Sequence, residues 1–217
     1  MEKEYRQYNL FRGLAQNTHV SRCVGNLFAV PCHSMSEGQK MDGEKILKRQ
    51  VLGAQEGSTQ AFRELFDTLS DKFFGYAVSH TSDRDAALDI VQESFIDLWK
   101  ALPRFHYRGD EQFFGFAFLV LRRKVAHFHR RRKTVSLEDI GEVAGDSTPT
   151  EDYRHLKRTV EELPPPYAEV IRLRYWSSLS FAEIASSLSI SENTAKVRHH
   201  RAVRLLENIL NRAQYGF

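Results

Sequence analysis

The chain has 217 residues, of which 41% are hydrophobic and 27% are charged, an ordinary balance for a globular protein. This length predicts one large or two small domains. Two cysteines are too few for a secreted scaffold held by disulfides, and no apolar run approaches the ~20 residues that a membrane span needs. No basic segment followed by an apolar one opens the sequence, so we expect no signal peptide, no membrane insertion and a cytoplasmic location.

Charge is distributed in blocks along the chain. Residues 44–103 contain seven basic and ten acidic residues, whereas residues 104–133 contain nine basic and two acidic ones. The sign reverses over residues 134–157, which contain two basic and six acidic residues. Blocks of opposite sign predict different partners for different segments, and a basic block near aromatic residues favours nucleic acid. Each block taken alone is also consistent with the solvated face of a helix.

Residues 1–43 show no sustained apolar period, and we expect a poorly ordered N-terminal extension there. A short helix is predicted from about Glu44, and then an amphipathic helix capped by Ser58. The next helix is predicted to be capped by Ser82 with Asp83 and Asp85, and to end at Pro103. Its apolar stripe is Ala87, Ile90, Val91, Ser94, Phe95, Leu98 and Leu102. A fourth helix is predicted over residues 111–132.

The acidic segment 134–145 lacks a strong period and is the best candidate for a linker. A helix is predicted to begin near Thr148 and to end before the three prolines 164–166. Three more helices are predicted over residues 167–175, 180–187 and 191–212. No segment alternates in the manner of a strand. The sequence therefore predicts an all-α protein of two small helical domains joined by a flexible acidic linker.

The last two predicted helices have the layout of a helix-turn-helix. Ser180 and Glu183 form a capping box, Ser189-Ile190 is a short turn, and Ser191 is an N-cap for a second helix that would lie in the major groove. Ala195, Ala202 and Leu206 are predicted to be buried. The candidate contacts with duplex DNA are Ser191, Asn193, Thr194, Lys196, Val197, His200, Arg201 and Arg204, the early ones reading bases and the arginines meeting phosphates. An ordinary helical hairpin with a basic face is the alternative.

Two further sets of side chains indicate binding surfaces before the linker. Cations hold phosphates and flat aromatic faces stack on unpaired bases, which predicts single-stranded DNA capture by Arg104, Phe105, Tyr107, Arg108, Arg122, Arg123, Arg130 and Arg131. The helical Phe113, Phe116 and Phe128 are more typical of a core. An acidic set, Asp85, Asp89, Gln92, Glu93 and Asp97, indicates a protein-binding surface or plain solvation. No metal or catalytic set completes it.

The segment from Asp85 to Phe95, followed by Leu98-Trp99, resembles region 2 of the sigma-70 family of RNA polymerase sigma factors. Two later segments are similar to region 4 of that family. They run from Glu162 to Tyr175 and from Leu179 to Ala185, and Ser191 to Thr194 and Arg201-Ala202 continue the match. Two domains without an intervening region 3 resemble the extracytoplasmic-function (ECF) group.

The resemblance implies a factor that binds core RNA polymerase through its largest and second-largest subunits and directs it to promoters. It divides the chain into the extension 1–43, region 2 over 44–133, a linker and helix start over 134–157, and region 4 over 158–217. The acidic set would dock on the polymerase, the basic block would hold the melted strand, and the helix-turn-helix would read the upstream element. An anti-sigma factor is a further partner to consider. No cofactor and no catalysis are expected.

Two other functions are consistent with parts of the sequence. The segment after Leu163 also resembles the DNA-binding module of LuxR-type regulators, which bind duplex DNA on their own. His19, Cys23, Cys32 and His33 have the side-chain chemistry of a zinc site, although the two cysteines are separated by eight residues in a segment without a pattern.

Overall fold

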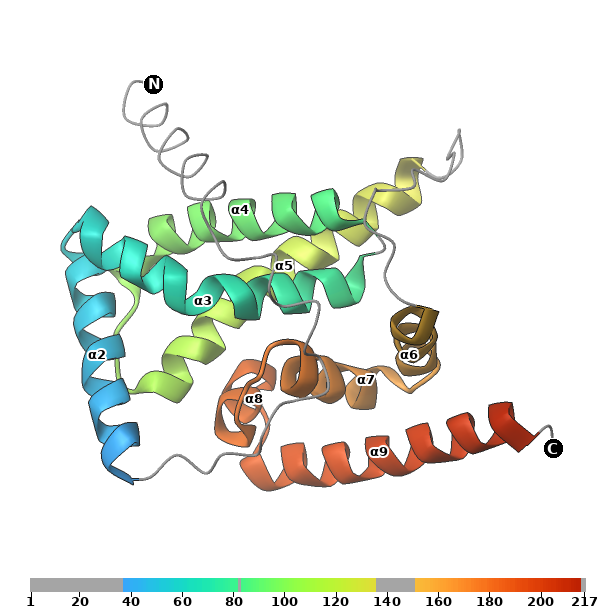
Figure 1. The fold of residues 1–217 in the computed structure, drawn as a ribbon. Coiled ribbons are helices and arrows are strands. Elements are labelled where there is room, and N and C mark those ends of the chain that lie inside the picture. Colours follow the sequence, from blue (N-terminus) through green and yellow to red (C-terminus); the bar gives the residue numbers. More distant parts are fainter. Residues whose placement is uncertain (1–36, 82, 136–150, 216–217) are drawn as a thin grey trace. The chain divides into compact units, whose positions relative to one another are not determined.

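Every regular element in the described residues of the computed structural model is a helix (Figure 1). The structure describes residues 37–81, 83–135 and 151–215, and all of them belong to one unit that spans residues 34–217. The first helices are α2 (Glu37–Gln55), α3 (Thr59–His80), α4 (Arg84–Ala101), the 3-10 turn η2 (Leu102–Arg104) and α5 (Asp110–Val135). The later ones are α6 (Glu151–Glu161), α7 (Pro165–Ile171), the π-helical turn η3 (Arg172–Trp176), α8 (Phe181–Leu188) and α9 (Glu192–Tyr215). The prediction of an all-α chain is confirmed.

Two helix starts show how local chemistry sets the element bounds. Ser58 caps α3, and its Oγ accepts from the backbone N–H of Ala61 at 3.2 Å, as predicted. The cap of α4 is Asp83, whose carboxylate accepts from the N–H of Asp85 at 2.9 Å. Ser82, the predicted cap, lies outside the described residues. A carboxylate at this position both satisfies an unpaired N–H and meets the positive end of the helix.

Other bounds differ from the predictions in ways that the chain chemistry explains. Helix α2 begins at Glu37 rather than near Glu44. Helix α4 stops at Ala101, before Pro103, as expected from the missing N–H of proline. Helix α6 ends at Glu161, before the three prolines. Pro165 and Pro166 begin α7, because the first turn of a helix does not need the N–H group that proline lacks. The predicted linker and the helix start at Thr148 lie outside the described residues.

The first core is formed where the apolar faces of α3, α4 and α5 meet. All seven residues of the predicted stripe are buried, six in α4 and Leu102 in η2. Phe95 packs against Phe73 of α3 with ring centroids 5.0 Å apart. Phe118 of α5 meets the other side of Phe73 at 5.4 Å. Phe113 is buried as predicted, Phe116 and Phe128 are half-buried, and Phe114 and Phe118 are buried without having been named as core residues. Helix α5 is covered on a second side because α8 packs against it.

The second core lies among α6, α7 and α9. Its buried residues are Val160, Leu163, Ala168, Ile171, Trp176 and Ala202. Val78 from α3 packs against this cluster, and η3 contacts α3. The helices before and after the predicted linker are therefore in direct contact.

Candidate nucleic-acid interface

The helix-turn-helix is built from α8, a two-residue turn and α9. Ser180 Oγ accepts from the N–H of Glu183 at 3.2 Å, and the Glu183 carboxylate accepts from the N–H of Ser180 at 2.6 Å. This is the predicted capping box. Ser189 adopts a left-handed conformation with φ 54° and ends α8. Ser191 then caps α9, and its Oγ accepts from the N–H of Thr194 at 3.0 Å.

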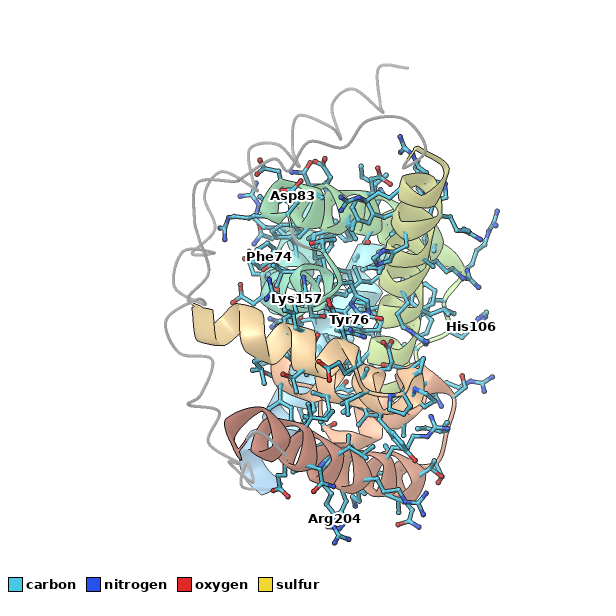
Figure 2. The ribbon with its side chains drawn as sticks, turned by 90° about the vertical axis from the view of Figure 1, so that its right-hand side faces the viewer. Phe74, Tyr76, Asp83, His106, Lys157 and Arg204 are labelled. Atoms are coloured by element: carbon cyan, nitrogen blue, oxygen red, sulfur yellow. The ribbon has the colours of Figure 1, made fainter. Side chains whose placement is uncertain are left out.

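The outer face of α9 presents the side chains that the sequence assigns to duplex DNA. Six of the eight candidates project from this face as exposed residues: Asn193, Lys196, Val197, His200, Arg201 and Arg204. Figure 2 shows Arg204 pointing outward from the helix. The opposite face is buried through Ala195 and Ala202. The other two candidates, Ser191 and Thr194, bond to each other at 2.7 Å and hold the helix start.

His199 of α9 packs against η3 and the start of α8. Its ring stacks on Tyr175 with centroids 5.7 Å apart and meets the edge of Phe181 at 5.3 Å. Tyr175 Oη is 3.1 Å from Nε2 of the histidine. Burial, together with the charges of Arg174 and His200, lowers the pKa of His199. His199 is half-buried, and its ring packs against both aromatic neighbours.

The candidate set for melted DNA surrounds η2 and follows α5. Arg104, Arg108, Arg123, Arg130 and Arg131 are exposed. Phe105 is half-buried and stacks on Phe116 with centroids 4.6 Å apart, while Tyr107 is half-buried and donates to Asp110. The amide of Gln55 donates to the carbonyls of Leu102, at 3.0 Å, and Phe105. Nothing in the sequence identified Gln55 as the residue that holds this loop.

Arg122 departs from the rest of that set because its guanidinium faces protein. Its Nε lies 3.0 Å from the Glu169 carboxylate on α7, and its Nη1 donates to the carbonyl of Ser187 on α8 at 3.0 Å. Glu169 also accepts from Tyr76 Oη at 2.6 Å and lies 3.6 Å from His80 Nε2. Burial opposes ionisation of Glu169, but contacts with His80 and Tyr76 and the charge of Arg122 hold its pKa below the usual range. The partners lie too far apart in the sequence for any local pattern to pair them.

The acidic set lies along α4. Asp85, Asp89 and Glu93 are exposed, and Gln92 and Asp97 are half-buried. Lys124 of α5 pairs with Asp97 at 2.8 Å and with Glu93 at 3.3 Å. Burial alone would lower the pKa of Lys124, but these two carboxylates raise it. Glu93 and Asp97 are therefore paired with a lysine of the basic block. Asp85 and Asp89 are the exposed acids of the set without such an ion pair to Lys124.

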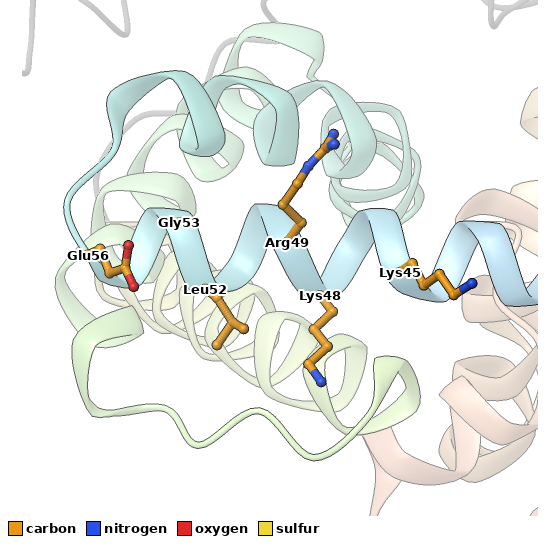
Figure 3. Close-up of a pocket in the computed structure, with 6 residues that line it drawn as sticks. All are labelled: Lys45, Lys48, Arg49, Leu52, Gly53 and Glu56. Atoms are coloured by element: carbon orange, nitrogen blue, oxygen red, sulfur yellow. The ribbon is translucent and has the colours of Figure 1, made fainter.

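The described residues contain no group of three or more His, Cys, Asp or Glu side chains placed to hold a metal ion, and His19, Cys23, Cys32 and His33 lie outside them. No described helix is long and apolar enough to cross a membrane. An open hollow runs along α2 (Figure 3), and its lining is Lys45, Lys48, Arg49, Leu52, Gly53 and Glu56. Its basic side chains were not among the sequence candidates.

Known protein families match this chain both before and after the predicted linker. Residues 65–135 match the family model for sigma-70 region 2, and residues 153–206 match that for sigma-70 region 4. The chain is 33% identical over 138 residues to RNA polymerase sigma factor SigV of Bacillus subtilis, covering 62% of this chain and 81% of the relative. It is 30% identical over 177 residues to ECF RNA polymerase sigma factor SigF of Caulobacter vibrioides, covering 79% and 98%.

A solved structure shares the fold. The sigma factor RpoE, in its complex with the anti-sigma factor NepR from Bartonella quintana, aligns with a TM-score of 0.55 at 22% identity. The alignment covers 70% of this chain and 98% of the other. The same set of helices is thus present in a chain of distant sequence.

Proposed function

The chain belongs to the ECF group of the sigma-70 family and is a promoter-recognising sigma factor, and we propose how it divides this work among its surfaces. The boundaries we propose are an extension over 1–43, region 2 over 44–133, a linker and helix start over 134–157, and region 4 over 158–217. Region 4 reads the upstream promoter element as duplex. Region 2 binds core RNA polymerase and captures the melted strand. The chain itself catalyses no reaction.

The observation that carries the proposal is the outer face of α9. A capping box, a left-handed turn residue and a serine cap fix the angle at which this helix leaves α8. Its exposed Asn193 and Lys196 have the donors and acceptors that read base edges in a major groove. The exposed Arg201 and Arg204 stand further along the helix, where they would meet phosphates.

Region 2 supplies surfaces of opposite charge. The exposed acids of α4, which include Asp85 and Asp89, form the proposed docking face for the largest polymerase subunit. The exposed arginines at η2 and at the end of α5 form the proposed strand-binding face, with Phe105 and Tyr107 beside them. Separation of the charges supports this division, because an acidic face repels the DNA backbone that a basic face attracts.

Two partners are proposed beyond promoter DNA and the largest subunit. Region 4 contacts the second-largest subunit of the core enzyme. An anti-sigma factor binds the free chain, a proposal supported by the shared fold with RpoE, whose structure was determined with the anti-sigma factor NepR. A cytoplasmic location follows from these partners.

A stand-alone LuxR-type regulator would account for α8 and α9 alone. It leaves the match of α3, α4 and α5 to sigma region 2 without an explanation. The two functions differ in their need for polymerase. A regulator of that type binds duplex DNA tightly without it.

Co-migration with bacterial core RNA polymerase on a sizing column tests the proposal. We expect the full chain to elute with the core enzyme at sub-micromolar concentration. Separate elution, together with tight binding of the free chain to duplex DNA, would contradict it and favour the regulator.

A further inference from the structure

The side-chain amide of Gln55 ties together the two ends of the turn η2. Its Nε2 donates to the carbonyl of Leu102, at 3.0 Å, and to the carbonyl of Phe105. Leu102 is the first residue of the turn, and Phe105 directly follows its last residue. An amide nitrogen carries two hydrogens, so it can donate to both carbonyls at once. Because hydrogen bonds in a 3-10 turn have poorer geometry than those in an α-helix, the amide adds support that the turn lacks.

The backbone that carries this amide is held by its own hydrogen bonds. Gln55 is the last residue of α2. Just beyond it, the N–H of Gly57 donates to the carbonyl of Ala54 at 3.1 Å, and the N–H of Ser58 donates to that of Gly53 at 3.0 Å. Gly57 has a φ of 88°, which glycine adopts without strain. The corner between α2 and α3 therefore sets the position of the amide, independently of the segment that the amide holds.

The segment after η2 has a buried side and an exposed side. Residues 105–109 belong to no helix, and Phe105 has the extended dihedrals φ −80° and ψ 133°. Phe105 stacks on Phe116 with centroids 4.6 Å apart, and Tyr107 donates to Asp110. Alternate side chains of an extended backbone point to opposite sides, and Figure 2 shows His106 pointing away from the protein. The exposed side of this segment, the outward row, consists of Arg104, His106 and Arg108.

We propose that Gln55 is a positioning residue for capture of the melted promoter strand. Its amide sets where the chain leaves η2, and thereby where the outward row meets the strand. A segment that is ordered before binding gives up little conformational freedom when the strand arrives. The inference rests on the strand capture proposed for region 2, and it adds the residue on which the base preference of that capture depends.

Positioning affects base preference more than overall attraction to the strand. A hydrogen bond to a base edge weakens steeply when its distance or angle changes, whereas the attraction between an arginine and a phosphate falls gradually with distance. Loss of the Gln55 amide leaves the cations of the outward row in the chain, so general affinity for DNA is retained. What is lost is the fixed placement of their donors against particular bases.

Two substitutions of Gln55 remove its donors and keep the length of the side chain. Gln55→Met leaves an apolar side chain, and Gln55→Glu leaves a carboxylate that can only accept hydrogen bonds. Gln60→Met is the matched control, because it makes the same change at an exposed site on α3. Asp83→Ala is a control for stability. It removes the N-cap of α4, at the end of that helix opposite to η2, and so destabilises region 2 without touching the outward row.

Each full-length chain is combined with core polymerase, and the holoenzyme selects templates from duplex DNA that is randomised over the promoter, with sequencing of the bound templates. The wild type should select two conserved blocks, the upstream one read by α9 and the downstream one captured as a melted strand. In both Gln55 variants we expect base preference in the downstream block to fall about tenfold, which is the discrimination that one good base contact provides. The upstream block should keep its preference, and both controls should match the wild type in both blocks.

Three results would overturn the inference. The first is an unchanged downstream preference in the two Gln55 variants. The second is an equal loss in Asp83→Ala, since lower stability would then account for the effect. The third is failure of both Gln55 variants to form holoenzyme, which would make the residue a requirement for folding or docking. Failure of the proposed function looks different, because the wild-type holoenzyme would then select no conserved block.

Discussion

Arg201 is exposed on the outer face of α9, well beyond the helix start. At that distance from the helix start a guanidinium contacts a DNA phosphate. Such a contact does not depend on base sequence, and it releases counterions from the DNA. In the holoenzyme, Arg201→Ala should weaken binding to promoter DNA and reduce the slope of log affinity against log salt by about 0.9. Arg63→Ala is the control, because it removes an equal charge from an exposed site on α3. An unchanged slope would rule out the phosphate contact.

Asp89 is exposed on α4 and belongs to the proposed polymerase-docking face. Asp89→Arg reverses a charge on this face, and we expect core-polymerase affinity to fall by about tenfold or more, equivalent to ~1.4 kcal/mol. The thermal unfolding curve should not change, since an exposed side chain away from caps contributes little to stability. Asp67→Arg on α3 makes the same change at another exposed site. Equal loss in both variants would show a general charge effect instead of a docking contact.

Helix α8 depends on its capping box more than a longer helix would. It has eight residues, and Ser180 and Glu183 satisfy two N–H groups of its first turn. Ser180→Ala should lower the free energy of unfolding by about 1 kcal/mol, measured by urea denaturation. Ser180→Thr retains an accepting hydroxyl and should restore most of the loss. If alanine and threonine are equally destabilising, the cap contributes nothing.

Features set by neighbours in the chain could be predicted from the sequence, and features set by distant neighbours could not. The cap of α3 at Ser58 and the box at Ser180 involve residues three apart, so a single pattern contains both partners. The pair of Arg122 and Glu169 joins residues in separate regions. Helical spacing in the sequence was enough to predict the exposed face of α9. It could not predict the second buried side of α5, because that side is buried only where α8 packs against it.

Within the unit that spans residues 34–217, Glu169 joins the two regions through Tyr76, His80 and Arg122, and we expect its ionisation to make stability depend on pH. The pKa of this carboxyl lies below its ordinary value of 4.5, so the ionised form contributes stability above that value. The contribution is lost as pH falls through the lower, folded pKa. We expect the free energy of unfolding to drop on acidification more steeply in the wild type than in Glu169→Gln, followed by urea denaturation at several pH values. Parallel pH profiles would contradict the role of this carboxylate.

In the function we propose, one chain reads two promoter elements for RNA polymerase. The most direct measurement is transcription by core polymerase plus this chain from a library of randomised upstream DNA, with sequencing of the templates that yield RNA. We expect chain-dependent transcripts whose templates share two conserved blocks at a fixed spacing. Arg201→Ala should weaken selection in the upstream block alone. Transcripts that do not depend on the chain, or templates with a single conserved block, would contradict it.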